Sequence, residues 1–278
     1  MIDVKIVTKA PVVSFFILAY LLSWLFWLPL LFMGSESRGL FMLLLIVGGQ
    51  GPFVAAIIVS KLVGEFKGFT RLLLMWRVSF KWYFAALALP VLIGIVGYGV
   101  FVVIGGTPVL SPETPPLYFY PLVLLFVMIL GGGLEEPGWR GFALPALLKR
   151  YTPFVASMIV GVVWAFWHLP LFFAPLSSQF GLPFGWYFLN TLALSVVFTW
   201  LFLKSAGSTV TAIVLHGGVN AALNWYPGLS DIATAWGTLP YFAPITVASW
   251  LIAGLLLVFG CQPKINFTKL VRTIARDG

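Results

Sequence analysis

Residues 12–33 form the run VVSFFILAYLLSWLFWLPLLFM, which contains no charged side chain. A helix needs about 20 consecutive apolar residues to cross the hydrocarbon core of a bilayer, so this run is long enough to span a membrane. Lys5 and Lys9 precede it, and no small-residue cleavage signal follows it, unlike in a cleavable signal peptide. We therefore expect it to remain as the first membrane span.

Similar apolar runs fill the rest of the chain. The 278 residues are 61% hydrophobic and only 9% charged, whereas a soluble domain has about 25% charged residues. No polar stretch is long enough for a separate soluble domain, so we predict one integral membrane domain over residues 1–278. The predicted fold is all-α, a polytopic transmembrane helical bundle of about eight spans. The predicted spans are 12–33, 40–62, 80–104, 118–134, 153–174, 184–203, 207–225 and 240–261.

The basic residues support this division of the chain. With eight spans, all but Arg38 fall on one side of the membrane, and cytoplasmic loops are the ones enriched in Lys and Arg. We expect a multi-pass protein of the plasma membrane with both termini in the cytoplasm. The net charge of +8 then faces anionic lipid of the bilayer, and no nucleic-acid partner is expected. The residues on this side are Lys5, Lys9, Lys61, Lys67, Arg71, Arg77, Lys81, Arg140, Lys149, Arg150, Lys204, Lys264, Lys269, Arg272 and Arg276.

The segment between the second and third predicted spans has a mixed character. From Phe66 to Arg77, aromatic and leucine residues alternate with Lys67 and Arg71. This pattern predicts an amphipathic helix that lies on the cytoplasmic face of the membrane. The single Cys261 permits no internal disulfide, and no cysteine cluster exists that could hold a metal.

Two adjacent carboxylates end the fourth apolar run. Glu135 and Glu136 are followed by Arg140, four residues after Glu136, so a continuous helix would place that pair on one face. Two neighbouring carboxylates in a dry setting do not both ionise cheaply, so we expect Arg140 to neutralise one and the other to serve as a general base. The alternative is a cluster at a helix end in the cytoplasmic headgroup zone, with residues 135–150 partly a loop.

Both histidines of the chain, His168 and His216, fall inside predicted spans. A lone histidine in an apolar helix is more often a packing residue, but Asn220 lies one turn from His216 on the same face. Two histidines and a carboxylate could ligate zinc or activate a water, and an asparagine with a histidine could hold an oxyanion. Asn190 and Asn224 are weaker candidates, for which hydrogen bonds between helices are a sufficient explanation.

Three segments together resemble the CPBP family of intramembrane proteases, which includes the CAAX and bacteriocin-processing proteases of the Rce1 type. They are Glu135-Glu136-x-x-x-Arg140, the aromatic-x-x-x-His segment from Trp164 to His168, and His216-x-x-x-Asn220. The resemblance extends over about residues 40–225, the expected protease core. Trp164 stands where the family often has Phe, which we expect to be conservative. Pro137 removes a backbone donor just after the glutamates and makes the Glu136 to Arg140 geometry less secure.

The resemblance implies a catalytic set. Glu135 and His168 would activate a water that attacks a peptide carbonyl, His216 and Asn220 would stabilise the oxyanion, and Glu136 with Arg140 would form a supporting pair. Family members are described both as glutamate-type and as metalloproteases. A divalent metal such as zinc, held by Glu135, His168 and His216, therefore stays open beside a metal-free base.

The leading hypothesis is an intramembrane endopeptidase that uses a buried Glu/His-activated water on a membrane-associated peptide or protein. A second hypothesis is a proton- or ion-coupled transporter in which the same buried acids and histidines form the path. A third is a non-proteolytic protein of the same fold that acts as an immunity protein or scaffold.

Overall fold

The computed structural model describes residues 4–107, 114–226, 232–234, 237–239 and 242–260. Cys261 and the basic residues that follow it lie outside the described residues. The long helices are α2 (Pro11–Trp27), α3 (Arg38–Gly49), α4 (Gly51–Leu62), α6 (Phe80–Val103), α7 (Tyr120–Ile129), α10 (Pro153–Trp167), α11 (Phe184–Lys204), α12 (Thr209–Ala222) and α13 (Phe242–Leu255). Shorter helical segments are α1 (Val4–Lys9), η1 (Leu28–Phe32), η2 (Ser35–Ser37), α5 (Phe66–Leu73), η3 (Leu117–Phe119), η4 (Gly133–Glu135), α8 (Glu136–Gly138), η5 (Trp139–Ala143), α9 (Leu144–Leu148), η6 (Leu169–Phe173), η7 (Leu223–Trp225) and η8 (Leu256–Gly260).

The predicted all-helical membrane bundle is confirmed. Seven helical stretches in the described part of the chain are long and apolar enough to cross a membrane, and they cover seven of the eight predicted spans. The one departure from an all-helical fold among the described residues is a short antiparallel pair, β1 (Ile232–Thr234) with β2 (Gly237–Leu239). The prediction of a single domain over residues 1–278 stays a prediction.

The seventh predicted span, residues 207–225, is a shorter helix than expected. α12 has 14 residues, which corresponds to about 21 Å at 1.5 Å per residue. Ser208 begins this helix, because its Oγ accepts a hydrogen bond from the Thr211 backbone N–H at 3.3 Å. α12 packs against α6, α7 and α11, so its sides contact other helices. A helix in this position does not need the length of a helix that faces lipid.

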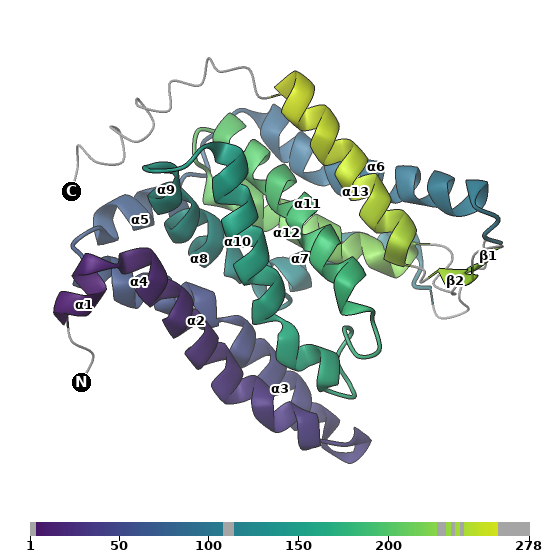
Figure 1. Cartoon of the computed structure of the whole chain (residues 1–278), viewed down its shortest axis with the longest axis horizontal. Helices are drawn as coiled ribbons and strands as arrows, with labels where there is room; N and C mark the ends of the chain where they lie inside the picture. Colours follow the sequence, from purple (N-terminus) through teal and green to yellow (C-terminus); the bar gives the residue numbers. More distant parts are fainter. Residues whose placement is uncertain (1–3, 108–113, 227–231, 235–236, 240–241, 261–278) are drawn as a thin grey trace.

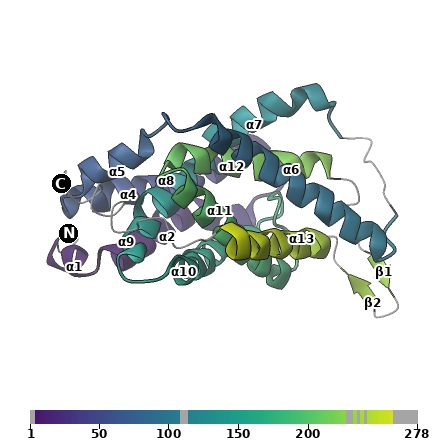
Figure 2. The ribbon, with the colours of Figure 1, turned by 90° about the horizontal axis from the view of Figure 1, so that it is seen from above.

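The helices form a bundle around α11 and α12. Figure 1 shows these two helices near the middle, with α2, α3 and α4 on one side and α6 and α13 on the other. Figure 2 shows α7 at the edge of the bundle, on the side away from α10 and α13. α12 therefore lies between the peripheral helix α7 and the centre of the molecule.

The first span illustrates how the sequence selects a protein face and a lipid face. Every fourth residue of one stripe is buried, namely Phe15, Ala19, Ser23 and Trp27. A second stripe with the same spacing is at least half exposed, namely Val13, Ile17, Leu21 and Leu25. Because all the exposed members are aliphatic, this face is suited to lipid and the other to packing inside the bundle.

The predicted amphipathic helix between the second and third spans is present but shorter than expected. α5 ends at Leu73, and its Phe69 and Leu72 are buried while Lys67 and Arg71 are exposed. Trp76, which we expected within this helix, lies beyond its end. α5 contacts η5, the segment that carries Arg140, so it covers the polar part of the bundle.

Candidate active site

The two glutamates follow a break in the fourth span. α7 ends at Ile129, and Gly132 has a φ of +117°, in the left-handed region that residues other than glycine rarely adopt. The chain then continues as η4 and α8, both of which contact α12. Glu135 and Glu136 are only 5% and 0% exposed. Residues 133–148 are helical, so the part of the alternative that made residues 135–150 partly a loop is wrong, and both carboxylates are buried in the bundle.

Pro137 does not separate Glu136 from Arg140. The helical segment α8 begins at Glu136, so Pro137 occupies a first turn, where a backbone N–H has no intrahelical partner to lose. Arg140 Nη1 donates to Glu136 Oε1 at 3.0 Å, which confirms the predicted pairing. Arg140 itself lies in the π-turn η5, a type of irregularity frequent at functional sites.

His216 joins this ion pair. Its Nδ1 lies 2.8 Å from Glu136 Oε1, the same oxygen that accepts from Arg140. A carboxylate oxygen accepts, so Nδ1 carries the hydrogen and Nε2 points away from Glu136. The carboxylate thus fixes the orientation of the imidazole, as second partners do for functional histidines.

The Arg140 guanidinium is enclosed by aromatic rings. Its central carbon lies 4.6 Å from the ring centroid of Trp164 and 4.4 Å from that of Phe198. Nη2 donates to Ser195 Oγ at 3.4 Å. Arginine tolerates this setting because a guanidinium stacks on aromatic faces and is weakly hydrated. The positive charge is therefore held in place without contact with solvent.

Two indole N–H groups hold Glu135. Trp164 Nε1 donates to Glu135 Oε2 at 2.7 Å, and Trp139 Nε1 lies 3.3 Å from the same oxygen. Phenylalanine has no donor to offer in place of Trp164. A phenylalanine here would leave Glu135 Oε2 without its shorter hydrogen bond, and the expectation that the replacement is conservative stays a prediction.

The second oxygen of Glu135 faces two of the other predicted site residues across Gly132. An ideal Cβ built on Gly132 would lie 2.6 Å from His216 Nε2, 3.1 Å from Glu135 Oε1 and 3.3 Å from Asn220 Nδ2. Asn220 Nδ2 also donates to the carbonyl of Gly131 at 3.1 Å, which ties α12 to the glycine break. An acceptor, an amide donor and an imidazole nitrogen therefore lie around Gly132, so close to it that a side chain at this position would collide with them.

His168 lies near this group without a direct bond to it. It is the residue that ends α10, and its Nδ1 donates to the carbonyl of Trp164 at 2.9 Å. Its ring is 5.5 Å from that of Tyr187 and 4.7 Å from that of Trp167, between centroids. Within the described ranges no hydrogen bond joins it to the glutamates or to Asn220. The structure thus joins Glu136, Arg140 and His216 by hydrogen bonds, places Glu135 and Asn220 around Gly132 together with His216, and leaves His168 beside them.

The three side chains expected as alternative zinc ligands do not form a ligand set. In the part of the chain that the structure describes, no group of three or more His, Cys, Asp or Glu side chains is close enough to hold a metal ion. Trp164 contacts both imidazoles, at centroid distances of 6.1 Å to His168 and 5.5 Å to His216. As placed, Glu135, His168 and His216 do not fit a tetrahedral zinc site.

The two weaker candidates are not explained by bonds between helices. Asn224 Nδ2, in η7, lies 3.0 Å from the carbonyl of Ala221 and 3.4 Å from that of Asn220, both at the end of α12 directly before it. Asn190 is buried in α11, and its Oδ1 has no hydrogen-bond partner among the described residues. The expectation of interhelical bonds is therefore wrong for Asn224 and for the Asn190 carbonyl oxygen.

The sequence contained signals for residues that we did not single out. Trp139 stands inside the glutamate motif and Trp164 inside the histidine motif, yet tryptophan in a membrane protein is usually an anchor at the bilayer interface. Gly132 was visible only as the end of an apolar run. An indole donor within four residues of a buried carboxylate was the available signal, because that carboxylate needs partners.

Fold and site together define a polytopic helical membrane protein with a buried acid, histidine and asparagine site at a broken span. Residues 117–222 match the Rce1-like family, described as Type II CAAX prenyl endopeptidase Rce1-like. A relative named CAAX prenyl protease 2, from Methanococcus maripaludis, is 38% identical over 103 residues. This similarity covers 35% of the present chain and 38% of the relative. The resemblance to the CPBP family that the three motifs indicated is thereby confirmed.

Proposed function

We propose that this protein is an intramembrane endopeptidase of the CAAX type that hydrolyses a peptide bond in a membrane-associated peptide or protein. The observation that carries the proposal is the meeting of Glu135 Oε1, His216 Nε2 and Asn220 Nδ2 around Gly132. All four residues fall within the segment similar to the Rce1-like family. Hydrolysis of an amide needs a base for water and donors for the oxyanion, and these three groups supply both.

In the proposed reaction, Glu135 takes a proton from a water whose oxygen attacks the carbonyl carbon of the substrate. The negative charge that develops on the carbonyl oxygen is held by the Asn220 amide and by His216 Nε2 when that nitrogen is protonated. Glu135 then gives its proton to the leaving nitrogen as the C–N bond breaks. Glu136 and Arg140 orient His216, and His168 assists from beyond Trp164.

The proposed setting is the plasma membrane, with both termini and the site toward the cytoplasm, which requires α12 to cross the bilayer as an eighth span beside the seven longer stretches. The basic residues of α5, and Lys149 and Arg150 directly after α9, support this orientation, since both helices contact the segment that carries Arg140. A substrate anchored in the same leaflet would then present its cleavage site to Glu135.

The test is a cleavage assay with the purified protein in liposomes. Two tethered peptides are compared, one with a prenylated C-terminal CAAX sequence and one with an unprenylated membrane anchor, and products are identified by mass spectrometry. We expect cleavage of at least one of them. The proposal is abandoned if neither is cleaved, or if cleavage is the same after Glu135→Gln.

Replacing Trp164 with phenylalanine should reduce cleavage. The change removes the 2.7 Å hydrogen bond to Glu135 and keeps an aromatic ring against Arg140. A hydrogen bond to a charged group contributes about 1.5–3 kcal/mol, so kcat should fall by roughly 10- to 100-fold. Steady-state kinetics with either tethered peptide measures this, and an unchanged kcat would mean that the indole does not position the base.

Replacing Gly132 with alanine should also reduce cleavage. The new Cβ would enter the space between His216, Glu135 and Asn220, and alanine is strained at a φ of +117°. We expect roughly 100-fold lower kcat, the size of effect that small displacements of a reacting group produce. The control is Gly99→Ala, since a Cβ at Gly99 meets nothing within 4 Å. Equal activity of both variants would argue against a reaction at Gly132.

Hydrolysis in this proposal runs without a metal, because Glu135, His168 and His216 as placed do not form a ligand set. Metal analysis of the active protein, followed by treatment with a chelator, tests this point. We expect cleavage to persist after the chelator. Loss of cleavage that zinc alone restores would replace the glutamate mechanism by a metal one.

A further inference from the structure

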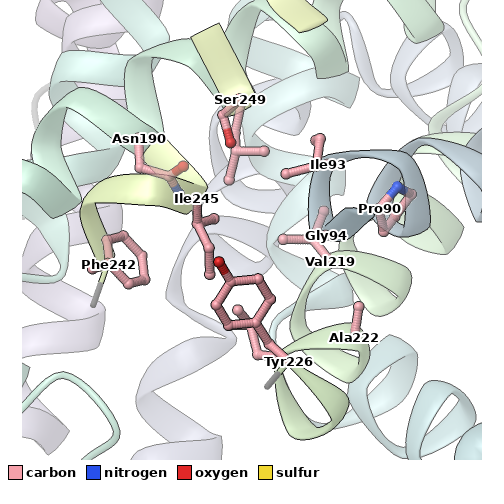
Figure 3. Close-up of a pocket in the computed structure, with 12 residues that line it drawn as sticks. Pro90, Ile93, Gly94, Asn190, Val219, Ala222, Tyr226, Phe242, Ile245 and Ser249 are labelled. Carbon is pink, nitrogen blue, oxygen red and sulfur yellow. The ribbon is translucent and has the colours of Figure 1, made fainter. Parts of the chain in front are cut away.

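A second group of buried polar atoms lies apart from Glu135 and His216. It belongs to a partly open pocket between α6, α11, α12 and α13, with a cavity volume of about 50 Å³ (Figure 3). Most of its wall is apolar, with Ile93 from α6, Leu194 from α11 and Ile245 from α13. α12 contributes Val219, so the pocket borders the face of α12 next to the one that carries His216 and Asn220.

Three polar atoms of this pocket have no hydrogen-bond partner among the described residues. They are Asn190 Oδ1, Tyr226 Oη and Ser249 Oγ. The three residues are 5%, 8% and 0% exposed, so bulk water does not satisfy them. Figure 3 shows their side chains entering the pocket from three different segments of the chain. Buried polar groups in native proteins are nearly always paired, and an unpaired one costs about 1–3 kcal/mol.

The pocket carries no charge. None of the residues that line it is acidic or basic. Burial raises the pKa of Tyr226 to about 12, so its phenol stays neutral and can donate as well as accept. A charged ligand would be desolvated here without a counter-charge, which is costly.

We propose that this pocket binds a neutral amphiphile whose polar end carries a hydroxyl, carbonyl or amide group. Asn190, Tyr226 and Ser249 hydrogen-bond that polar end, and an apolar chain contacts Ile93, Leu194 and Ile245. The three polar side chains select against a plain hydrocarbon, and the uncharged wall selects against an ionised head group. This site does not depend on the proposed proteolysis, since it shares no side chain with the Glu135 site.

The test uses the full chain in lipid nanodiscs and a long-chain primary alcohol that carries a photoreactive diazirine. After illumination, labelled peptides from α6, α11, α12 and α13 are quantified by mass spectrometry. We expect saturable labelling that hexadecanol competes away and that hexadecane and hexadecanoate do not. Equal competition by hexadecane would overturn the proposal, because lipid chains or water alone would then occupy the space.

A matched pair of glycine variants locates the label. Gly94 lines the pocket and Gly99 does not. A Cβ on either glycine meets nothing within 4 Å, so the first carbon of a leucine side chain fits at both positions. Gly94→Leu should lower the apparent affinity for the probe at least about tenfold, whereas Gly99→Leu should leave it unchanged. Ser249→Ala with Tyr226→Phe should remove the preference for the alcohol over the alkane. Identical labelling in Gly94→Leu and Gly99→Leu would contradict the proposal.

Discussion

Glu135→Gln should lower the rate of peptide cleavage by roughly 1,000-fold or more, the upper part of the range for loss of a general base. Glutamine keeps the shape of the side chain, and its carbonyl oxygen can still accept from Trp164 Nε1. It cannot take a proton from water. The loss should therefore appear in kcat, while binding of the tethered peptide stays close to that of the unchanged protein.

Glu65→Gln is the matched control for this substitution. Glu65 pairs with Lys149 at 2.8 Å, with side chains that are 50% and 39% exposed. An exposed pair of this kind contributes about 0–1 kcal/mol, so neither activity nor stability should change measurably. The role given to Glu135 is wrong if both variants cleave the peptide at the same rate.

Arg140→Met should be the most destabilising single change in the site. Arg140 and Glu136 are both 0% exposed, and removal of the guanidinium leaves a buried carboxylate whose remaining charge partner, among the residues that the structure describes, is His216. Breaking a buried ion pair on one side costs about 3–5 kcal/mol. Thermal unfolding in detergent measures the loss, and cleavage should fall with it because His216 loses its fixed partner.

The double variant Glu136→Gln with Arg140→Met distinguishes this explanation from a simple loss of packing. Removing both charges together should recover most of the stability lost in Arg140→Met, because no uncompensated charge remains. If the double variant is less stable than Arg140→Met alone, packing of the guanidinium on Trp164 and Phe198 is the larger contribution.

The fold followed from the sequence because the bilayer imposes a simple requirement. Each membrane span needs an apolar run of a given length, and seven such runs could be read directly, as in residues 12–33. The length of α12 did not follow from this reasoning, because α12 is surrounded by other helices and does not have to match the thickness of the bilayer. The left-handed turn that breaks the fourth span at Gly132 was also unforeseen, and Asn220 of α12 donates a hydrogen bond to the neighbouring Gly131 carbonyl.

The site was partly predictable for a related reason. Charged and imidazole side chains inside apolar helices are costly, so Glu136, Arg140 and His216 stood out and were expected to find partners. The donors to Glu135 did not stand out. Trp139 and Trp164 are apolar by composition, and their indole N–H groups matter only through the way that η5 and α10 approach each other. His168, with an equally clear motif, lies one aromatic ring away from the others.

A structure with a tethered peptide whose scissile amide is replaced by a phosphinate tests the central claim most directly. The phosphinate oxygens imitate the oxyanion and the attacking water. We expect one oxygen about 3 Å from Asn220 Nδ2 and His216 Nε2, and the other at the same distance from Glu135 Oε1. A phosphinate bound elsewhere in the bundle, with none of these three atoms within hydrogen-bond distance, would contradict the account.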